Sequence, residues 1–225
     1  VQHSTQVYED WLIQAGGSHF NADLTRPTND TPEGFAALSQ HVRHGLVSEV
    51  MPPEGVDSGI PNLHSFCAGR VAIQQLWPGD IANCEVNVPD VFEDIMVGEP
   101  FGGPEKQGLQ LFVDKYMVYK LTRDPDACFA ALEWLSRVDV NNAINVEWRR
   151  AMPCRTAAES LDIYQISPWR EFMANREFGV LRPVVDDHFD VQPAMGRWVE
   201  KAALDEVSVT EALRGMDDEV TAIMA

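Results

Sequence analysis

The sequence predicts an α/β fold in which helices predominate and a few short strands lie between them. Three observations lead to this prediction. The chain has 225 residues and a hydrophobic content of 45%, which is enough to bury a core. Apolar residues recur at helical spacing along most of the sequence. The short apolar runs typical of strands are few and are separated by predicted helices, which favours a layered α/β arrangement over a bundle or a sandwich.

The first half of the chain begins with two helical segments. Residues 4–15 have an apolar helical pattern that the pair Gly16-Gly17 stops. A second helix starts at Pro32, since proline is favoured in the first turn, and ends near Gly45. Further on, we expect a helix over 58–68 and strands over 70–76, 92–97 and 109–119.

The second half of the chain is mostly helical. Asp124-Pro125 opens the clearest helix, in which Phe129 and Leu135 belong to the apolar face. The residues Ser208 to Glu211 have the pattern of a capping box before the last helix. Helices are predicted over 124–135, 139–149, 168–178, 193–205 and 209–223.

The composition excludes several partners and leaves the cysteines open. A formal net charge of −18 argues against nucleic acid or anionic lipid as the main partner, because both require basic surfaces. No apolar run reaches the roughly 20 residues of a membrane span. The cysteines at 67, 84, 128 and 154 form no C-x-x-C pair, and the sequence is compatible with disulfides or with buried thiols.

The strongest candidate binding motif is WPGD at 77–80, after the predicted strand 70–76. The indole face of Trp77 can pack against the C–H groups of a sugar ring, and Asp80 can accept hydrogen bonds from hydroxyl groups. A helix starting at Pro78 would add N–H donors. The alternative is that Trp77 belongs to the core and Asp80 only caps the helix.

Other polar residues are weaker candidates. Gln107 and Gly108 precede a predicted strand and could approach a ligand, or could form an ordinary loop. Arg155 follows a proline, and with the basic residues 149–150 it could hold an anion. His41 and His44 share a helix face without a third metal ligand, so we predict no metal site. The sequence has no motif for a nucleophile, a nucleotide or another cofactor, and we expect no enzyme and no cofactor.

A series of weak motifs occurs in a characteristic order. It comprises YEDW at 8–11, GGSHF at 16–20, NDTPE at 29–33, GRVAI at 69–73, Trp77, Gly108, DP at 124–125, PCR at 153–155, RP at 182–183 and SVTEAL at 208–213. This order resembles family 1 extracellular solute-binding proteins, the carbohydrate receptors of ABC importers, which include the maltose-binding proteins. The resemblance covers nearly all of the chain.

The resemblance implies a periplasmic-binding-protein-like (type II) fold with two lobes, a hinge and a ligand cleft. It implies a receptor for a sugar or sugar derivative, located in the periplasm or lipid-anchored outside the cell, that delivers its ligand to a membrane permease. Family members are about twice as long, so we expect the N-terminal portion to be lacking. The expected domains are 1–103 in the C-terminal lobe, 104–160 as a return segment of the N-terminal lobe, and 161–225 as helices on the C-terminal lobe.

The resemblance also implies ligand contacts. By this analogy the aromatic positions are Tyr8 and Trp77, the cleft-side turn holds Gln107 and Gly108, Arg155 is the polar residue after the loop proline, and His188 lies in a variable segment. Trp77 lies two residues earlier than the stacking tryptophan of maltose-binding protein, and Trp11 is the second candidate for that role. Two alternatives remain: a receptor for an anion such as a sugar phosphate or sulfonate, and a carbohydrate-active hydrolase that uses carboxylates.

Overall fold

The computed structural model describes residues 2–46, 48, 59–60, 63–113, 116–144, 152–153 and 156–225. It divides into two compact units that interleave along the chain. Unit 1 comprises Val1–Gly55, Pro100–Phe112 and Glu177–Ala225, and unit 2 comprises Val56–Glu99 and Val113–Arg176. The assignment of 1–103, 104–160 and 161–225 to the lobes of a larger protein stays a prediction.

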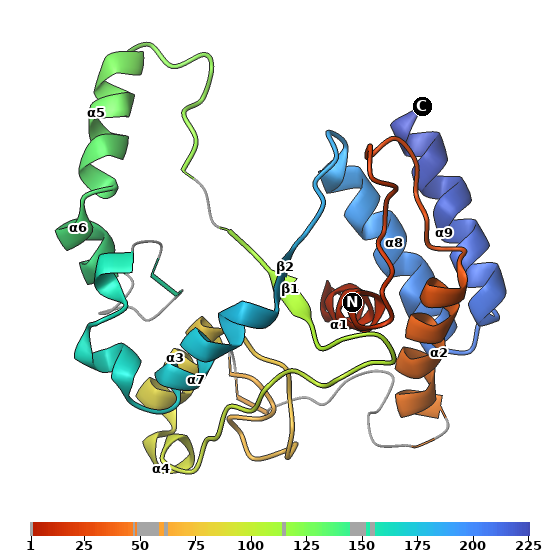
Figure 1. Ribbon diagram of the computed structural model, residues 1–225, viewed down its shortest axis with the longest axis horizontal. Coiled ribbons are helices and arrows are strands. Elements are labelled where there is room, and N and C mark those ends of the chain that lie inside the picture. Colours follow the sequence, from red (N-terminus) through yellow and green to blue (C-terminus); the bar gives the residue numbers. More distant parts are fainter. Residues whose placement is uncertain are drawn as a thin grey trace. The chain divides into compact units, whose positions relative to one another are not determined.

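Unit 1 is a set of helices beside a small parallel sheet (Figure 1). Its strands pair in parallel with Leu109 opposite Gly179 and Leu111 opposite Leu181. Parallel strands need a crossover connection, which explains why these two are far apart in the sequence. The elements are α1 (Gln2–Gln14), α2 (Pro32–Leu46), β1 (Leu109–Leu111), β2 (Gly179–Leu181), α8 (His188–Ala203) and α9 (Val209–Met224).

The helices of unit 1 end and begin where local chemistry requires it. The chain leaves α1 through Gly16, whose φ of +82° suits glycine. The predicted capping box of α9 is confirmed: Ser208 Oγ accepts from the N–H of Glu211, and Glu211 Oε2 accepts from the N–H of Ser208 at 2.9 Å. Helix α8 starts earlier than the predicted residue 193 and contains Pro193.

The core of unit 1 lies where α1, α2, α8 and α9 meet. Its fully buried side chains include Leu12, Leu38, Val199 and Met216. The loop before α2 is tied to α9, because both carboxylate oxygens of Asp217 accept from the backbone N–H of Asn29 at 3.0 Å. These hydrogen bonds anchor the loop before α2 to α9.

Unit 2 has short helices around a second core. The core side chains are Leu63, Cys67, Ile81, Ala82, Cys84, Ile95, Tyr164 and Trp169. Asp124 caps α5 by accepting from the N–H of Ala127 at 2.9 Å, so the predicted start of that helix is confirmed. The helices are α3 (Pro78–Asn87), α4 (Pro89–Phe92), α5 (Pro125–Leu135), α6 (Val138–Asn142), η2 (Thr156–Ala158), η3 (Asp162–Gln165), α7 (Trp169–Ala174) and η4 (Asn175–Phe178), the last running into unit 1.

The α/β prediction is confirmed, but two predicted strands are wrong. Residues 70–76 form no strand, and Ile73 is 76% exposed because no neighbouring strand covers it. Residues 92–97 are also not a strand, since Pro89 starts the short helix α4 and turns follow Phe92. The predicted strand over 109–119 is confirmed only at its beginning, as β1.

The predicted helix over 58–68 is wrong where the structure describes it, because the chain forms turns over residues 65–69. No described helix is long and apolar enough to cross a membrane. Among the described residues, no group of histidine, cysteine and acidic side chains is arranged to hold a metal ion.

Candidate functional site

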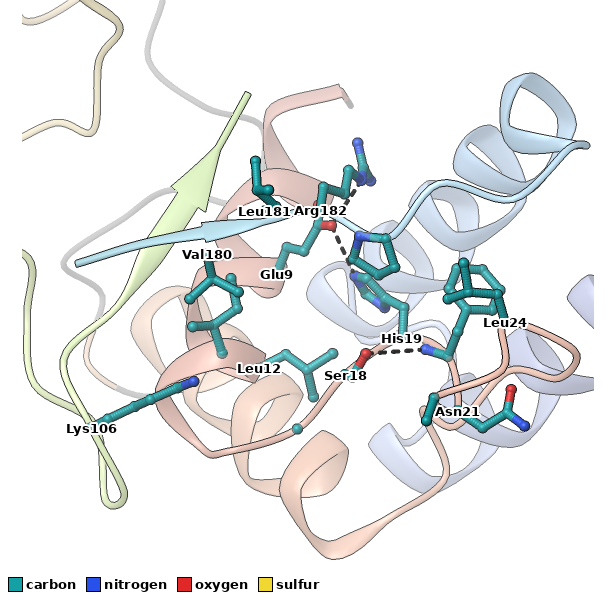
Figure 2. A pocket seen from close by; sticks show the side chains of 15 residues that line it. Glu9, Leu12, Ser18, His19, Asn21, Leu24, Lys106, Val180, Leu181 and Arg182 are labelled. Carbon is teal, nitrogen blue, oxygen red and sulfur yellow. Dashed lines mark hydrogen bonds and ion pairs between the residues drawn. The ribbon is translucent and has the colours of Figure 1, made fainter. Parts of the chain in front are cut away.

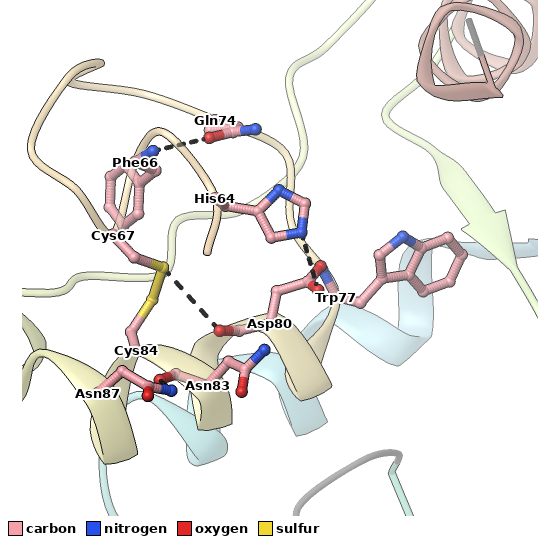
Figure 3. Close-up of a disulfide and its surroundings, with 9 residues drawn as sticks. All are labelled: His64, Phe66, Cys67, Gln74, Trp77, Asp80, Asn83, Cys84 and Asn87. Atoms are coloured by element: carbon pink, nitrogen blue, oxygen red, sulfur yellow. Dashed lines mark hydrogen bonds and ion pairs between the residues drawn. A yellow bond between two sulfur atoms is a disulfide. The ribbon is translucent and has the colours of Figure 1, made fainter. Parts of the chain in front are cut away.

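The WPGD motif forms a defined corner at the start of α3 (Figure 3). Trp77 is the residue before the helix, and its side chain is 38% exposed. Its backbone N–H donates to Asp80 Oδ2 at 2.9 Å. The interpretation of Trp77 as a core residue is therefore wrong, and the interpretation of Asp80 as a helix cap is confirmed.

Asp80 has a second partner that the sequence did not reveal. Its Oδ1 lies 3.0 Å from Nε2 of His64, and both side chains are partly exposed. The pair forms because the turn over 65–69 folds back toward α3, as Figure 3 shows. Both carboxylate oxygens of Asp80 therefore have protein partners, namely the backbone N–H of Trp77 and the ring of His64.

A disulfide between Cys67 and Cys84 fastens this corner. Both cysteines are fully buried, and their Cα atoms are 5.4 Å apart. One comes from the turn after His64 and the other from α3, so the bond closes a loop that carries Trp77 (Figure 3). The sequence left the cysteine pairing open, and the structure settles it for this pair; Cys128 is free and partly buried.

The remaining predicted ligand residues lie in unit 1 or outside the described residues. Tyr8 is fully buried, and its hydroxyl donates to Asn29 Oδ1 at 3.4 Å, so its ring faces the core. His188 is the first residue of α8, and burial, followed by Arg182, lowers its pKa. Arg155 lies outside the described residues.

Gln107 and Gly108 occupy the approach to β1 in unit 1. The amide of Gln107 donates to the carbonyl of Pro100 at 3.2 Å and is exposed. Gly108 is buried, and a Cβ there would lie 2.6 Å from Cγ2 of Ile13, so close packing on α1 requires the glycine. Its carbonyl accepts from the amide of Gln14 at 2.9 Å. The structure thus brings together Trp77 and Asp80, and ligand contacts by all of the predicted site residues stay predictions.

Unit 1 also has a pocket of about 460 Å³ that sequence reasoning missed (Figure 2). Apolar side chains of α1 and β2 and the loop over 17–24 line it. Three buried polar side chains reach it, namely Glu9, His19 and Arg182. Arg182 Nε lies 2.8 Å from Glu9 Oε1. Only the tertiary fold brings these residues together, so no local motif could have revealed the pocket.

Burial dominates the electrostatics of this pocket. It raises the pKa of Glu9 to about 8, and the nearby guanidinium of Arg182 opposes that rise. It lowers the pKa of His19 to about 4, because a buried imidazolium loses its hydration. At neutral pH the His19 ring is therefore uncharged.

Comparison with known proteins shows the fold. No family model and no curated protein sequence matches the chain. A tagatose-bound ABC transporter solute-binding protein from Thermotoga lettingae matches with a TM-score of 0.79, 18% identity, and coverage of 100% of this chain and 57% of that one. The sugar-binding protein MalE from Xanthomonas citri matches with a TM-score of 0.80, 16% identity, and coverage of 98% and 56%.

A third structure agrees with these two. The maltose-maltodextrin binding protein of Alicyclobacillus acidocaldarius matches with a TM-score of 0.79, 19% identity, and coverage of 96% of this chain and 60% of that one. The chain thus spans little more than half the length of the structures it matches. The predicted fold is confirmed: the chain matches part of the two-lobed architecture found in sugar-binding solute-binding proteins of ABC transporters.

Proposed function

We propose that this chain is part of a sugar-binding receptor of an ABC importer and that Trp77 is a stacking surface for the sugar. The observation that carries the proposal is the exposed Trp77 at the start of α3, in a fold shared with sugar receptors. Its backbone N–H donates to Asp80, and the Cys67–Cys84 disulfide closes the loop that carries it. An exposed tryptophan with a fixed backbone offers apolar area at a small entropic cost.

Binding in such a receptor would favour a closed arrangement of its lobes. A ligand shifts this equilibrium only by the contacts that it makes in the closed state and not in the open one. Stacking on Trp77 would supply area, and polar side chains would bind the hydroxyl groups. The protein would then deliver the sugar to a membrane permease without chemical turnover.

The disulfide supports a location outside the cytoplasm, because disulfides persist in oxidising compartments. A periplasmic or externally anchored receptor meets this condition. The alternative ligand, an anion such as a sugar phosphate or sulfonate, would depend on Arg149, Arg150 or Arg155, all of which lie outside the described residues.

The test is a calorimetric titration of the protein with a panel of mono- and disaccharides, polyols and sugar acids. We expect one class of uncharged sugar to bind, and Trp77→Ala to weaken binding at least tenfold, about 1.4 kcal/mol. Trp134→Ala is the matched control, because Trp134 is 55% exposed on α5 and is not a predicted ligand residue. Equal affinities for wild type and Trp77→Ala would remove Trp77 from the site.

A further inference from the structure

Helix α5 has the composition of a buried helix, yet none of its residues, all of which the structure describes, is buried. Its sequence, PDACFAALEWL, contains only two charged side chains, Asp126 and Glu133. A helix that is apolar around most of its circumference normally lies inside a protein. Phe129, which the sequence predicts for the apolar face, is nevertheless 61% exposed. The fold of this chain therefore leaves α5 without the cover that its composition requires.

The segment before α5 shows the same mismatch between sequence and exposure. Its sequence, YMVYKL at 116–121, continues the predicted strand over 109–119, but residues 116–119 form no strand in the described structure. Met117 is 85% exposed and Tyr119 is 70% exposed. Aromatic and apolar residues of this kind are typical of strands, and a strand forms only when it has a partner. The segment therefore has the sequence of a strand whose partner is not in the described part of the chain.

The two features are continuous, and their chemistry argues against two kinds of cover. Both belong to unit 2, and in Figure 1 the extended segment runs directly into α5. A membrane does not fit, because a helix of 11 residues is only about 16 Å long and its two charges are acidic. A second copy of the chain is disfavoured, because a net charge of −18 makes two copies repel each other.

The length of the matched structures points to a third kind of cover. These structures match nearly all of this chain, and each continues well beyond the part that the chain covers. Helices and sheets must bury their apolar faces against another element of the same core. A core that further polypeptide completes would leave an apolar helix and an unpaired strand exposed when only this part of the fold is present.

We propose that residues 116–121 and α5 form the docking surface for further polypeptide of the same protein. In the complete protein, residues 116–119 pair as a strand with a strand of that polypeptide, and α5 packs on the sheet so formed. Backbone hydrogen bonds hold the strand, and the apolar side chains of α5 supply the buried area. The inference rests on the part of the proposed function that makes this chain a piece of a longer receptor, and not on its sugar.

The test compares the 225-residue chain with the full-length product of its gene, without any ligand. We expect the amide hydrogens of 116–119 to exchange about 100-fold more slowly in the longer protein, because a paired strand opens rarely. Met117 should be oxidised by hydrogen peroxide about tenfold more slowly there, since the covering polypeptide removes its exposure. Light scattering shows whether the 225-residue chain is a monomer. No readout requires a sugar, so a failure of the proposed sugar binding would leave these results unaffected.

A matched pair of variants makes the result decisive. Phe129 of α5 and Phe35 of α2 both lie early in a helix, and they are 61% and 50% exposed. In the 225-residue chain, neither Phe129→Asp nor Phe35→Asp should move the urea midpoint of unfolding by more than about 0.3 M. In the longer protein, Phe129→Asp should lower the midpoint by roughly 1 M or more, because it buries a charge, whereas Phe35→Asp should not.

Four outcomes overturn the inference. They are equal exchange of 116–119 in the two proteins, equal effects of the two variants in the longer protein, a dimer of the 225-residue chain that protects 116–119, and a gene that encodes nothing beyond these residues. If Phe129→Asp prevents the longer protein from folding while Phe35→Asp does not, the result supports the inference, and the exchange of the unmodified protein tests it independently.

Discussion

Removing the disulfide between Cys67 and Cys84 should destabilise unit 2 measurably. The bond joins residues 17 positions apart and so constrains a loop of the unfolded chain. The chain-entropy relation for a loop of that length gives about 3 kcal/mol at 25 °C. Both sulfurs are also buried in the core, so a Cys67→Ser/Cys84→Ser double variant adds the cost of buried hydroxyl groups.

The assay is urea unfolding with and without a reductant, together with hydrogen exchange over residues 63–87. With a slope of roughly 1–3 kcal/mol per molar urea, a loss of about 3 kcal/mol moves the midpoint by about 1–3 M. Cys128→Ser is the control, because Cys128 is not in this bond. The reasoning is refuted if thiol titration proves the bond cleaved while the midpoint and the exchange rates stay the same.

Two further predictions concern unit 1. Gly34→Ala should lower the free energy of unfolding by more than about 2 kcal/mol, because its Cβ would lie 1.9 Å from the carbonyl oxygen of Asn29. The control Gly98→Ala has open space around the Cβ and should change the free energy of unfolding by less than about 0.5 kcal/mol. Thermal melts compare the two variants. Burial lowers the pKa values of His19 and His41 to about 4. The stability that these neutral rings contribute is therefore fully present above pH 6.5, the ordinary pKa of histidine, and is lost as the pH falls toward 4. The free energy of unfolding of His41→Leu minus that of wild type should therefore increase as the pH falls from 6.5 to 4, as measured by denaturation curves. A difference that does not change with pH would contradict the assignment.

The sequence was sufficient where a structure depends on neighbouring residues. The Asp124 cap and the Ser208–Glu211 capping box each place a side chain three residues from the N–H that it binds, so both helix starts could be predicted. Trp77 could be singled out in the same way, because a helix-starting proline follows it. That it is exposed became clear only from the structure, since exposure depends on what packs against the residue.

The tertiary structure decided the features that join distant residues. The run over 70–76 has the apolar composition of a strand, but a strand requires a partner. Among the described residues only 109–111 and 179–181 pair as strands. The Cys67–Cys84 bond and the meeting of Glu9 with Arg182 likewise depend on how the chain folds back. The sequence by itself determined the fold class and the local helix signals, because these depend on spacing and neighbouring groups. The disulfide and the polar pocket depend on three-dimensional proximity, which no local pattern encodes.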